Sequence, residues 1–381
     1  MFSSHFEEKL FAGRRKTRPV KVGNLTLGGD NPIYVQSMTC SDTRNVPATL
    51  AEINALVNEG CELVRVAVVD MEAIKALKAI KEQIRIPLIA DIHFHYKLAL
   101  EAIENGADKI RINPGNIGSY AKFTEVVNRA KSREIPLRIG INSGSLEKDI
   151  LEKHGSPTVD ALVESAVRYA NFCSDLNFNE LIFSIKSSNV ATMILANLKL
   201  SEQLDYPLHL GVTEAGLKQQ GIIKSTLGIG TLLQLGIGDT IRVSLTGDAV
   251  QEISIAYNIL KASNARILGP DIVACPTCGR IGIELEKIVE EVQKQLNTCK
   301  LPIKIAILGC IVNGPGEAKE ADIGIAGGDG KAMLFKKGKL VKTLKEEEMV
   351  DALVSEVNII EAEWLKKFNG ENASSLKNKD T

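Results

Sequence analysis

Two short segments late in the chain carry the residue types with the strongest chemistry. Ala274–Arg280 reads Ala-Cys-Pro-Thr-Cys-Gly-Arg and contains a Cys-x-x-Cys pair. Gly309–Glu317 supplies another cysteine after an apolar run and continues through glycine and proline to a glutamate. Thiolates brought together on tight turns select zinc or an iron–sulfur cluster. The two segments therefore predict a metal centre that includes Cys275, Cys278 and Cys310.

The fourth ligand of this centre is less obvious. The other four cysteines are Cys40, Cys61, Cys173 and Cys299. Three of them fall in segments of an earlier domain, where cysteine is typically a small core residue, and the strand that follows Cys299 separates it from Cys310. Glu317 remains, beyond a Gly-Pro-Gly sequence expected to bend the chain back. A carboxylate on iron is exchangeable and would reserve one iron for substrate, whereas a structural zinc site, which prefers four Cys/His ligands, stays open as the alternative.

The composition is that of an ordinary globular chain. It has 381 residues, 44% of them hydrophobic and 24% charged, which is enough for two domains. Its 46 basic and 47 acidic side chains nearly cancel, so charge gives no case for nucleic acid or an anionic membrane as a partner. The basic run Arg14–Arg18 is short and typical of a solvated face. With no visible signal peptide and no bilayer-spanning apolar run, the seven cysteines predict a cytoplasmic protein with reduced thiols.

The first part of the chain has a regular alternation of strands and helices. After a hairpin over residues 20–27, eight short apolar runs occur at 33–38, 63–68, 87–92, 109–114, 137–142, 181–186, 207–212 and 240–245. Helix-like segments fill most gaps between them, and gap seven, Gly216–Gly238, is rich in glycine. An open doubly wound sheet would more often show a Gly-x-Gly-x-x-Gly turn after its first strand. The pattern predicts an α/β fold with a (β/α)₈ TIM barrel.

The alternation stops near Leu268-Gly269-Pro270, where a smaller α+β unit is predicted. It should contain helices at 284–296 and 347–364, strands at 303–308 and 322–326, and a hairpin near residues 336–339. We expect a barrel domain over residues 1–265, a metal-binding domain over 266–368 and a polar tail over 369–381.

Alternate side chains of each barrel strand must point into the lumen. In Lys109–Asn113, the two isoleucines should face the helices, so Arg111 and Asn113 should face inward near the carboxyl-terminal mouth. The same parity places further polar side chains inside, namely Arg65, Asp91, His93, Arg138, Asn142, Lys186, His209, Arg242 and Ser244. Glu214 lies just beyond the seventh strand.

Four arginines and a lysine in one lumen require negative charge, because an unpaired buried charge costs several kcal/mol. Asp91 and Glu214 cannot offset five cations, so the sequence predicts a phosphate or diphosphate ligand held by arginine forks. Pairing of individual arginines with helix acids at the rim is the alternative. The turns after strands four and five, Asn113–Asn116 and Asn142–Ser145, could add backbone N–H donors. His93-Phe94-His95 invites a zinc interpretation, but only His209 is placed to help, and a hydrogen-bonding role is more typical.

Five motifs resemble one family, the 4-hydroxy-3-methylbut-2-en-1-yl diphosphate synthases of the non-mevalonate isoprenoid pathway, in their short bacterial two-domain form. The motifs are 90–94 (Ala-Asp-Ile-His-Phe), 111–116 (Arg-Ile-Asn-Pro-Gly-Asn), 212–216 (Val-Thr-Glu-Ala-Gly), 274–280 and 309–317. The resemblance extends from Arg18 to the last helix, and the insert domain of plant-type members is missing.

The resemblance implies reductive ring opening of 2-C-methyl-D-erythritol 2,4-cyclodiphosphate to (E)-4-hydroxy-3-methylbut-2-enyl diphosphate. It implies a [4Fe–4S] cluster on Cys275, Cys278, Cys310 and Glu317, fed singly with two electrons from reduced flavodoxin or ferredoxin. The diphosphate would be held by Arg65, Arg111, Arg138, Lys186 and Arg242, with hydrogen bonds from Asn113, Asn142 and Ser244. Glu214 becomes the candidate acid, with Asp91 and His93 nearby. In this family one subunit's barrel faces the partner's cluster domain, so a homodimer is also implied.

A rival interpretation keeps the phosphate-binding barrel but gives the second domain a structural zinc ion. Such a protein would be a non-redox lyase, a hydrolase or a binding module. Metal content separates the two, since one predicts about four iron and four sulfide per chain and the other about one zinc.

Overall fold

A computed structural model describes residues 13–310, 312–328 and 330–377 of the chain. It divides into two compact units, Met1–Arg266 and Ile267–Thr381. The second unit thus begins within two residues of the expected position. No helix in the described part of the chain is both long enough and apolar enough to cross a membrane.

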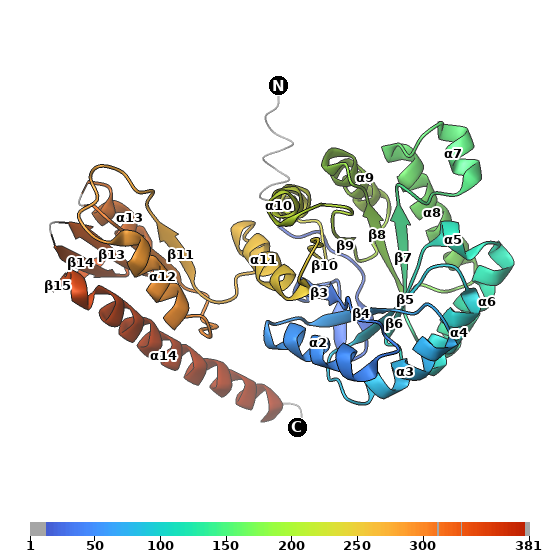
Figure 1. The fold of residues 1–381 in the computed structure, drawn as a ribbon, viewed down its shortest axis with the longest axis horizontal. Coiled ribbons are helices and arrows are strands. Elements are labelled where there is room, and N and C mark those ends of the chain that lie inside the picture. The colour runs from blue at the N-terminus through green and yellow to red at the C-terminus, as the bar shows by residue number, and fades with distance from the viewer. Residues whose placement is uncertain (1–12, 311, 329, 378–381) are drawn as a thin grey trace. The chain divides into compact units, whose positions relative to one another are not determined.

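The first unit is the predicted barrel (Figure 1). Its eight parallel strands are β3 (Tyr34–Met38), β4 (Leu63–Ala67), β5 (Leu88–Ile92), β6 (Lys109–Ile112), β7 (Leu137–Asn142), β8 (Leu181–Lys186), β9 (His209–Leu210) and β10 (Thr240–Ile241). They pair in the order β8-β7-β6-β5-β4-β3-β10-β9. A parallel bridge between Phe183 and Leu208 joins the two ends of this order, and so closes the barrel. The TIM-barrel prediction is confirmed.

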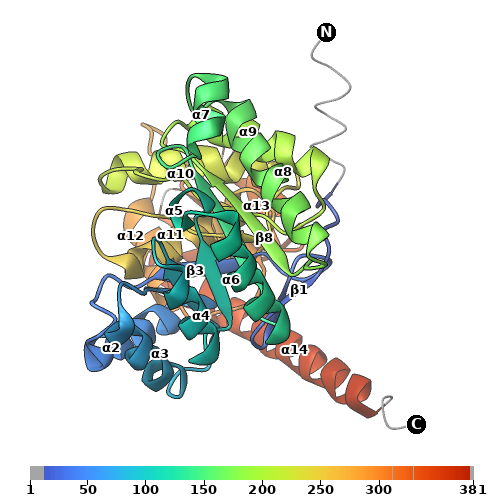
Figure 2. The ribbon, with the colours of Figure 1, turned by 90° about the vertical axis from the view of Figure 1, so that its right-hand side faces the viewer.

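Helices surround the strands (Figures 1 and 2). They are α2 (Val46–Asn58), α3 (Met71–Lys81), α4 (Tyr96–Glu104), α5 (Pro114–Ile117), α6 (Tyr120–Ser132), α7 (Lys148–His154), α8 (Val159–Asp175), α9 (Val190–Gln203), α10 (Lys218–Gln234) and α11 (Ala249–Ala262). The glycine-rich seventh gap is helix α10. A Cβ atom at Gly228 would lie 2.7 Å from Val212 Cγ2, so this glycine lets the helix approach the end of a strand closely.

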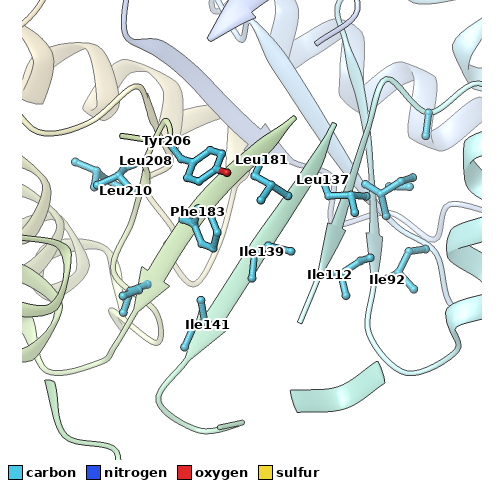
Figure 3. Packing of buried hydrophobic residues seen from close by; sticks show 14 of the residues in the cluster. Ile92, Ile112, Leu137, Ile139, Ile141, Leu181, Phe183, Tyr206, Leu208 and Leu210 are labelled. Atoms are coloured by element: carbon cyan, nitrogen blue, oxygen red, sulfur yellow. The ribbon is translucent and has the colours of Figure 1, made fainter. Parts of the chain in front are cut away.

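Each strand has two different faces. Leu137, Ile139 and Ile141 on β7 belong to the buried layer between strands and helices, which Figure 3 shows. The alternate residues of β7, Arg138 and Asn142 among them, point the other way, into the lumen. This is the period of two expected for a closed barrel, and it brings polar side chains together inside.

A hairpin closes the amino-terminal end of the barrel. It consists of β1 (Val20–Val22) and β2 (Leu25–Leu27), which pair antiparallel. Its buried side chains form one cluster with residues at the start of four barrel strands, namely Tyr34, Leu63, Ile89 and Ile182. The lumen is therefore sealed by apolar side chains at this end.

The second unit is a five-stranded sheet in the order β11-β12-β13-β14-β15. The strands are β11 (Asp271–Ala274), β12 (Lys304–Leu308), β13 (Ile323–Gly328), β14 (Lys331–Lys336) and β15 (Lys339–Lys345), the first three of them parallel. Helices α12 (Leu285–Gln295) and α14 (Met349–Lys377) contribute to its larger core, and α13 (Gly314–Glu320) packs in a smaller cluster against Ala326 and Phe335. The 3₁₀ turn η1 (Glu346–Glu348) precedes α14.

The second unit differs from expectation in three places. Strand β11 was not predicted, because it has only four residues, of which Ile272 and Val273 alone are large and apolar. The Gly-Pro-Gly sequence begins helix α13 rather than a simple bend. Proline fits a helix start, and Gly324 of the neighbouring strand leaves the space that the helix occupies, since a Cβ there would lie 2.7 Å from Ala318 Cα. Helix α14 continues to Lys377, into the expected polar tail, of which residues 378–381 lie outside the described residues.

Candidate active site

A cavity of about 330 Å³ lies at the carboxyl-terminal mouth of the barrel. It is lined by nearly all of the polar residues predicted for the lumen, namely Arg65, Asp91, His93, Arg111, Arg138, Asn142, Lys186, Glu214, Arg242 and Ser244. Met38, Ser184, Val212 and Thr213 complete the lining and were not singled out from the sequence. Ser184 could have been found, because it lies two residues before Lys186 and shares its parity.

Asn113 is the one residue predicted to bind the diphosphate that does not line the cavity. Its side chain is buried and already engaged on both sides. The Oδ1 atom accepts a hydrogen bond from the Gly115 N–H at 3.1 Å and so begins α5, while Nδ2 donates to Ser145 Oγ. Asn113 therefore ties together the two turns after strands β6 and β7.

Asp91 is the central acceptor of the cavity. Arg111 Nη1 donates to its Oδ1 at 3.0 Å, and Arg65 Nε and His93 Nε2 lie 3.5 and 3.4 Å from its Oδ2. Burial acts to raise the pKa of Asp91, but Arg65, the hydrogen bond with His93 and Arg111 hold it well below its usual value. One permanent carboxylate thus orients two arginines and one histidine.

The remaining charges leave the site strongly cationic. Glu252, on α11, lies 3.5 Å from Arg242 Nε, so one arginine does pair with a helix acid, as the alternative allowed. Arg138 is 1% exposed, and its Nε and Nη1 atoms have no hydrogen-bond partner among the described residues. Burial, followed by the neighbouring arginines, lowers the pKa of Lys186 well below its usual value. Burial lowers the pKa of Arg65 to about 9, so it stays charged at neutral pH. Such a site favours an anionic ligand with several oxygens.

Two basic residues lie deeper than the cavity. Lys109 is fully buried, and its Nζ atom has no partner in the described part of the chain. It was not predicted as a site residue, although it has the parity of Arg111. His209 is also fully buried, with Nδ1 2.8 Å from Thr240 Oγ1. Neither residue lines the cavity, and Lys109 adds a basic group beneath it.

Glu214 has an unusual backbone. It is exposed, lies between β9 and α10, and has a φ of +46°, a left-handed conformation that non-glycine residues seldom adopt. Its neighbours Val212 and Ala215 are buried, which holds the turn in place. Such strain is concentrated at functional sites, where the surrounding structure compensates for it.

The three cysteines of the predicted metal centre follow the carboxyl ends of β11 and β12 in the five-stranded sheet. Cys275 directly follows β11, and Cys310 follows β12 after one glycine; these strands are parallel, with Ala274 paired to Ile307. Cys278 is exposed, and all seven cysteines of the chain are free thiols. Glu317 is exposed and lies in the first turn of α13.

Backbone N–H groups point at two of these sulfur atoms. The Gly309 N–H donates to Cys275 Sγ at 3.2 Å. Backbone hydrogen bonds at Asn313 and Val312 lower the pKa of Cys310, which favours its thiolate form. N–H donors to sulfur are one of the levers by which proteins tune iron–sulfur clusters. The donor set therefore fits such a cluster, although in the described residues no three Cys, His, Asp or Glu side chains are already grouped as metal ligands.

The model of the GcpE TIM-barrel domain matches residues 17–257, and that of the GcpE protein C-terminal domain matches residues 271–359. Two similar proteins are both named 4-hydroxy-3-methylbut-2-en-1-yl diphosphate synthase (flavodoxin). The one from Bacillus cytotoxicus is 54% identical over 350 residues, which cover 92% of this chain and 95% of that protein. The one from Clostridium perfringens is 54% identical over 347 residues, 91% of this chain and 99% of that protein.

Among solved structures, the dihydropteroate synthase of Stenotrophomonas maltophilia is 15% identical, with 65% of this chain and 98% of that chain covered at a TM-score of 0.49. That likeness is too distant to carry a functional argument. The two family domains and the relatives, by contrast, match most of the chain at high similarity. The chain belongs to the GcpE family of 4-hydroxy-3-methylbut-2-en-1-yl diphosphate synthases.

Proposed function

We propose that this chain converts 2-C-methyl-D-erythritol 2,4-cyclodiphosphate into (E)-4-hydroxy-3-methylbut-2-enyl diphosphate in the cytoplasm. The observation that carries the proposal is the excess of buried cations around one cavity, which suits a substrate with two phosphates. The reaction takes up two electrons, breaks the ring C–O bond to phosphate, and releases one hydroxyl as water. It therefore consumes protons as well as electrons, and the site needs an acid.

In this proposal the cations bind and orient the cyclic diphosphate. Arg65, Arg111, Arg138, Lys186 and Arg242 surround the cavity and neutralise the phosphates. Asn142 and Ser244 add neutral hydrogen bonds. Asn113 acts indirectly, since its side chain holds the turns that border the cavity. Orientation by fixed charges removes the need to reorganise solvent during the reaction.

Glu214 is the proposed proton donor for the departing hydroxyl. It lies at the cavity wall and exposed, so it can exchange protons with solvent between turnovers. Asp91 is unsuited to that task, because its neighbours keep its pKa low and hold it ionised. Asp91 and His93 instead keep Arg65 and Arg111 in place.

The cofactor in this proposal is a [4Fe–4S] cluster held by Cys275, Cys278, Cys310 and Glu317. When bound, it supplies single electrons and a Lewis-acidic iron. The three thiolates would hold it firmly, and the carboxylate of Glu317 would be its exchangeable ligand. The relatives' names specify flavodoxin, and we propose reduced flavodoxin or ferredoxin as the donor. A homodimer is part of the same proposal.

Metal analysis tests the proposal directly. Anaerobically purified protein should contain about four iron and four sulfide per chain. After one-electron reduction, addition of the cyclic diphosphate should change its electron paramagnetic resonance spectrum, because substrate approaches the iron. About one zinc per chain and no iron would support the rival non-redox barrel instead.

Substrate binding should also be accompanied by proton uptake. Burial and the facing guanidinium groups of Arg65, Arg138, Arg242 and Arg111 depress the pKa of Lys186 in the free protein. A bound diphosphate favours the charged ammonium and raises that pKa, so the complex holds more protons than the free protein. Affinity should therefore increase as pH falls between the free and bound pKa values.

Calorimetric titration at about pH 8 in buffers of different ionisation enthalpy measures this effect. We expect uptake of up to about one proton per bound cyclic diphosphate, and less in Lys186→Met. A binding enthalpy that is independent of the buffer would contradict the prediction.

A further inference from the structure

Four cations of the cavity come from alternate strands of the barrel. Arg65 is on β4, Arg111 on β6, Lys186 on β8, and Arg242 directly follows β10. The other four strands, or the residue directly after one of them, contribute four residues between these cations, which we call the spacers: Met38, Asp91, Gly140 and Gly211. Around the barrel, each of these four cations therefore lies between two spacers, while the fifth cation of the cavity, Arg138, is on β7 with the spacer Gly140.

Two of the spacers, Met38 and Asp91, have side chains that lie between neighbouring cations. Met38 Sδ lies 2.9 Å from Arg65 Nη2 and 3.6 Å from Arg242 Nη1, so it separates these two arginines. Asp91 lies between Arg65 and Arg111 and pairs with both. On this half of the barrel the positions of the charges are set by side-chain contacts.

The other two spacers are glycines, and the neighbouring cation occupies the place of their missing side chains. A Cβ atom at Gly140 would lie 2.6 Å from Arg111 Nε and 3.0 Å from its Nη2. At Gly211 a Cβ would lie 2.8 Å from Lys186 Nζ and 2.9 Å from the Arg242 carbonyl oxygen. All of these distances are at or below the closest approach that real Cβ atoms show.

The strand register explains why Arg111 reaches Gly140. Arg111 is paired with Arg138, so Gly140 is its diagonal neighbour, two residues further along β7. Side chains in strands lean along the strand, and Arg111 leans across this glycine toward the mouth. Neither Gly140 nor Gly211 has a positive φ, so an alanine could adopt both backbones. Space, rather than backbone conformation, is what requires glycine.

We propose that Gly140 and Gly211 are positioning residues of the anion site, whose bare Cα atoms decide where Arg111 and Lys186 place their charges. The inference deepens the proposed function and rests on it. At Gly140 the consequence is specific, because Arg111 is held by Asp91 at 3.0 Å and, in the amide orientation that satisfies both groups, by the Asn142 oxygen at 3.2 Å. A methyl group at residue 140 cannot be accommodated unless this buried guanidinium shifts, and a shift changes its geometry with both partners.

A double-mutant cycle tests the proposal on anaerobically purified holoenzyme. The variants are Gly140→Ala, Arg111→Ala and the double variant, and the measurements are the dissociation constant for the cyclic diphosphate, KM, kcat and the thermal midpoint. Gly140→Ala alone should weaken binding about 10- to 100-fold, the range of one lost charge-assisted contact, and raise KM more than it lowers kcat. In the Arg111→Ala background the same change should alter affinity less than about twofold, since no guanidinium remains to be displaced.

Gly230→Ala is the matched control. A Cβ atom there would approach only to 3.9 Å of Ile259 Cγ2, an ordinary contact, so affinity and thermal midpoint should stay near those of the wild type. Gly211→Ala should weaken binding as well. In a Lys186→Ala background it should weaken binding by a smaller factor but not by zero, because the Arg242 carbonyl oxygen still obstructs the methyl group.

The outcomes distinguish a failure of this inference from a failure of the proposed function on which it rests. If the wild type does not bind the cyclic diphosphate, the proposed function fails. If the wild type binds it and Gly140→Ala binds equally well, or loses the same factor in both backgrounds, the positioning role alone is overturned. Should Gly140→Ala not fold, rescue of folding by Arg111→Ala supports the role, and a double variant that also fails to fold refutes it.

Discussion

Replacing Cys275 with serine is expected to remove the brown colour of the anaerobic protein and its turnover together. The serine hydroxyl stays protonated at neutral pH and cannot replace a cysteine thiolate as an iron ligand. Cys275 directly follows β11, the strand on one side of the proposed cluster site. Iron should fall from about four per chain to below about one, and turnover by about a thousandfold or more, because no other group on the chain is proposed to carry electrons. Iron and sulfide analysis, the visible spectrum and the rate with reduced flavodoxin measure the result.

Cys299→Ala is the control for this experiment. Cys299 belongs to the core of the same unit, where burial raises its pKa to about 11, and we do not propose it as a ligand. It should keep normal iron content. A Cys275→Ser protein that remained brown and active would exclude Cys275 from the cluster.

Replacing Glu214 with glutamine should stop turnover and leave both cofactor and substrate binding in place. Glutamine has nearly the same shape and the same tolerance for the left-handed backbone at this position, but it cannot donate the proton that lets hydroxide leave as water. Loss of a general acid typically costs a factor of about 10² to 10⁴. Single-turnover rates, iron content and the dissociation constant for the cyclic diphosphate separate the effect on chemistry from an effect on binding.

Glu134→Gln provides a closely matched control. Glu134 is also exposed and also has a positive φ, +55°, but it precedes β7 and so lies at the opposite end of the barrel. Its replacement should leave turnover unchanged. Normal turnover in Glu214→Gln would remove Glu214 from the acid role and direct attention to His93.

The barrel strands can be predicted from the sequence because short apolar runs recur at regular intervals and only two faces are available to each strand. The same parity is sufficient to place Arg65, Arg111 and Lys186 inside the lumen. It also applies to Lys109, which is two residues before Arg111 on the same strand, and the structure shows this lysine fully buried. Sequence reasoning missed Lys109 because a lysine at the start of a strand looks like an ordinary solvated residue.

Other parts of the site depend on contacts between distant elements, which no local pattern contains. Glu252 looks like an ordinary helix acid until the barrel closes and brings α11 against Arg242. Gly140 and Gly211 resemble any glycine in a strand, and only the three-dimensional structure shows which side chain crosses them. Helix α13 follows the same principle: the two glycines in its first turn have poor helix propensity, and tight packing against Gly324 compensates for it.

The apolar hairpin β1–β2 closes the amino-terminal end of the barrel lumen. Substrate, protons and product must all pass through the carboxyl-terminal mouth. The proposed product keeps both phosphates, so the cations that capture the substrate also retain the product. Each catalytic cycle must therefore include a step in which the diphosphate product leaves the cations that attract it. If the site bound diphosphate too tightly, slow product release would limit turnover.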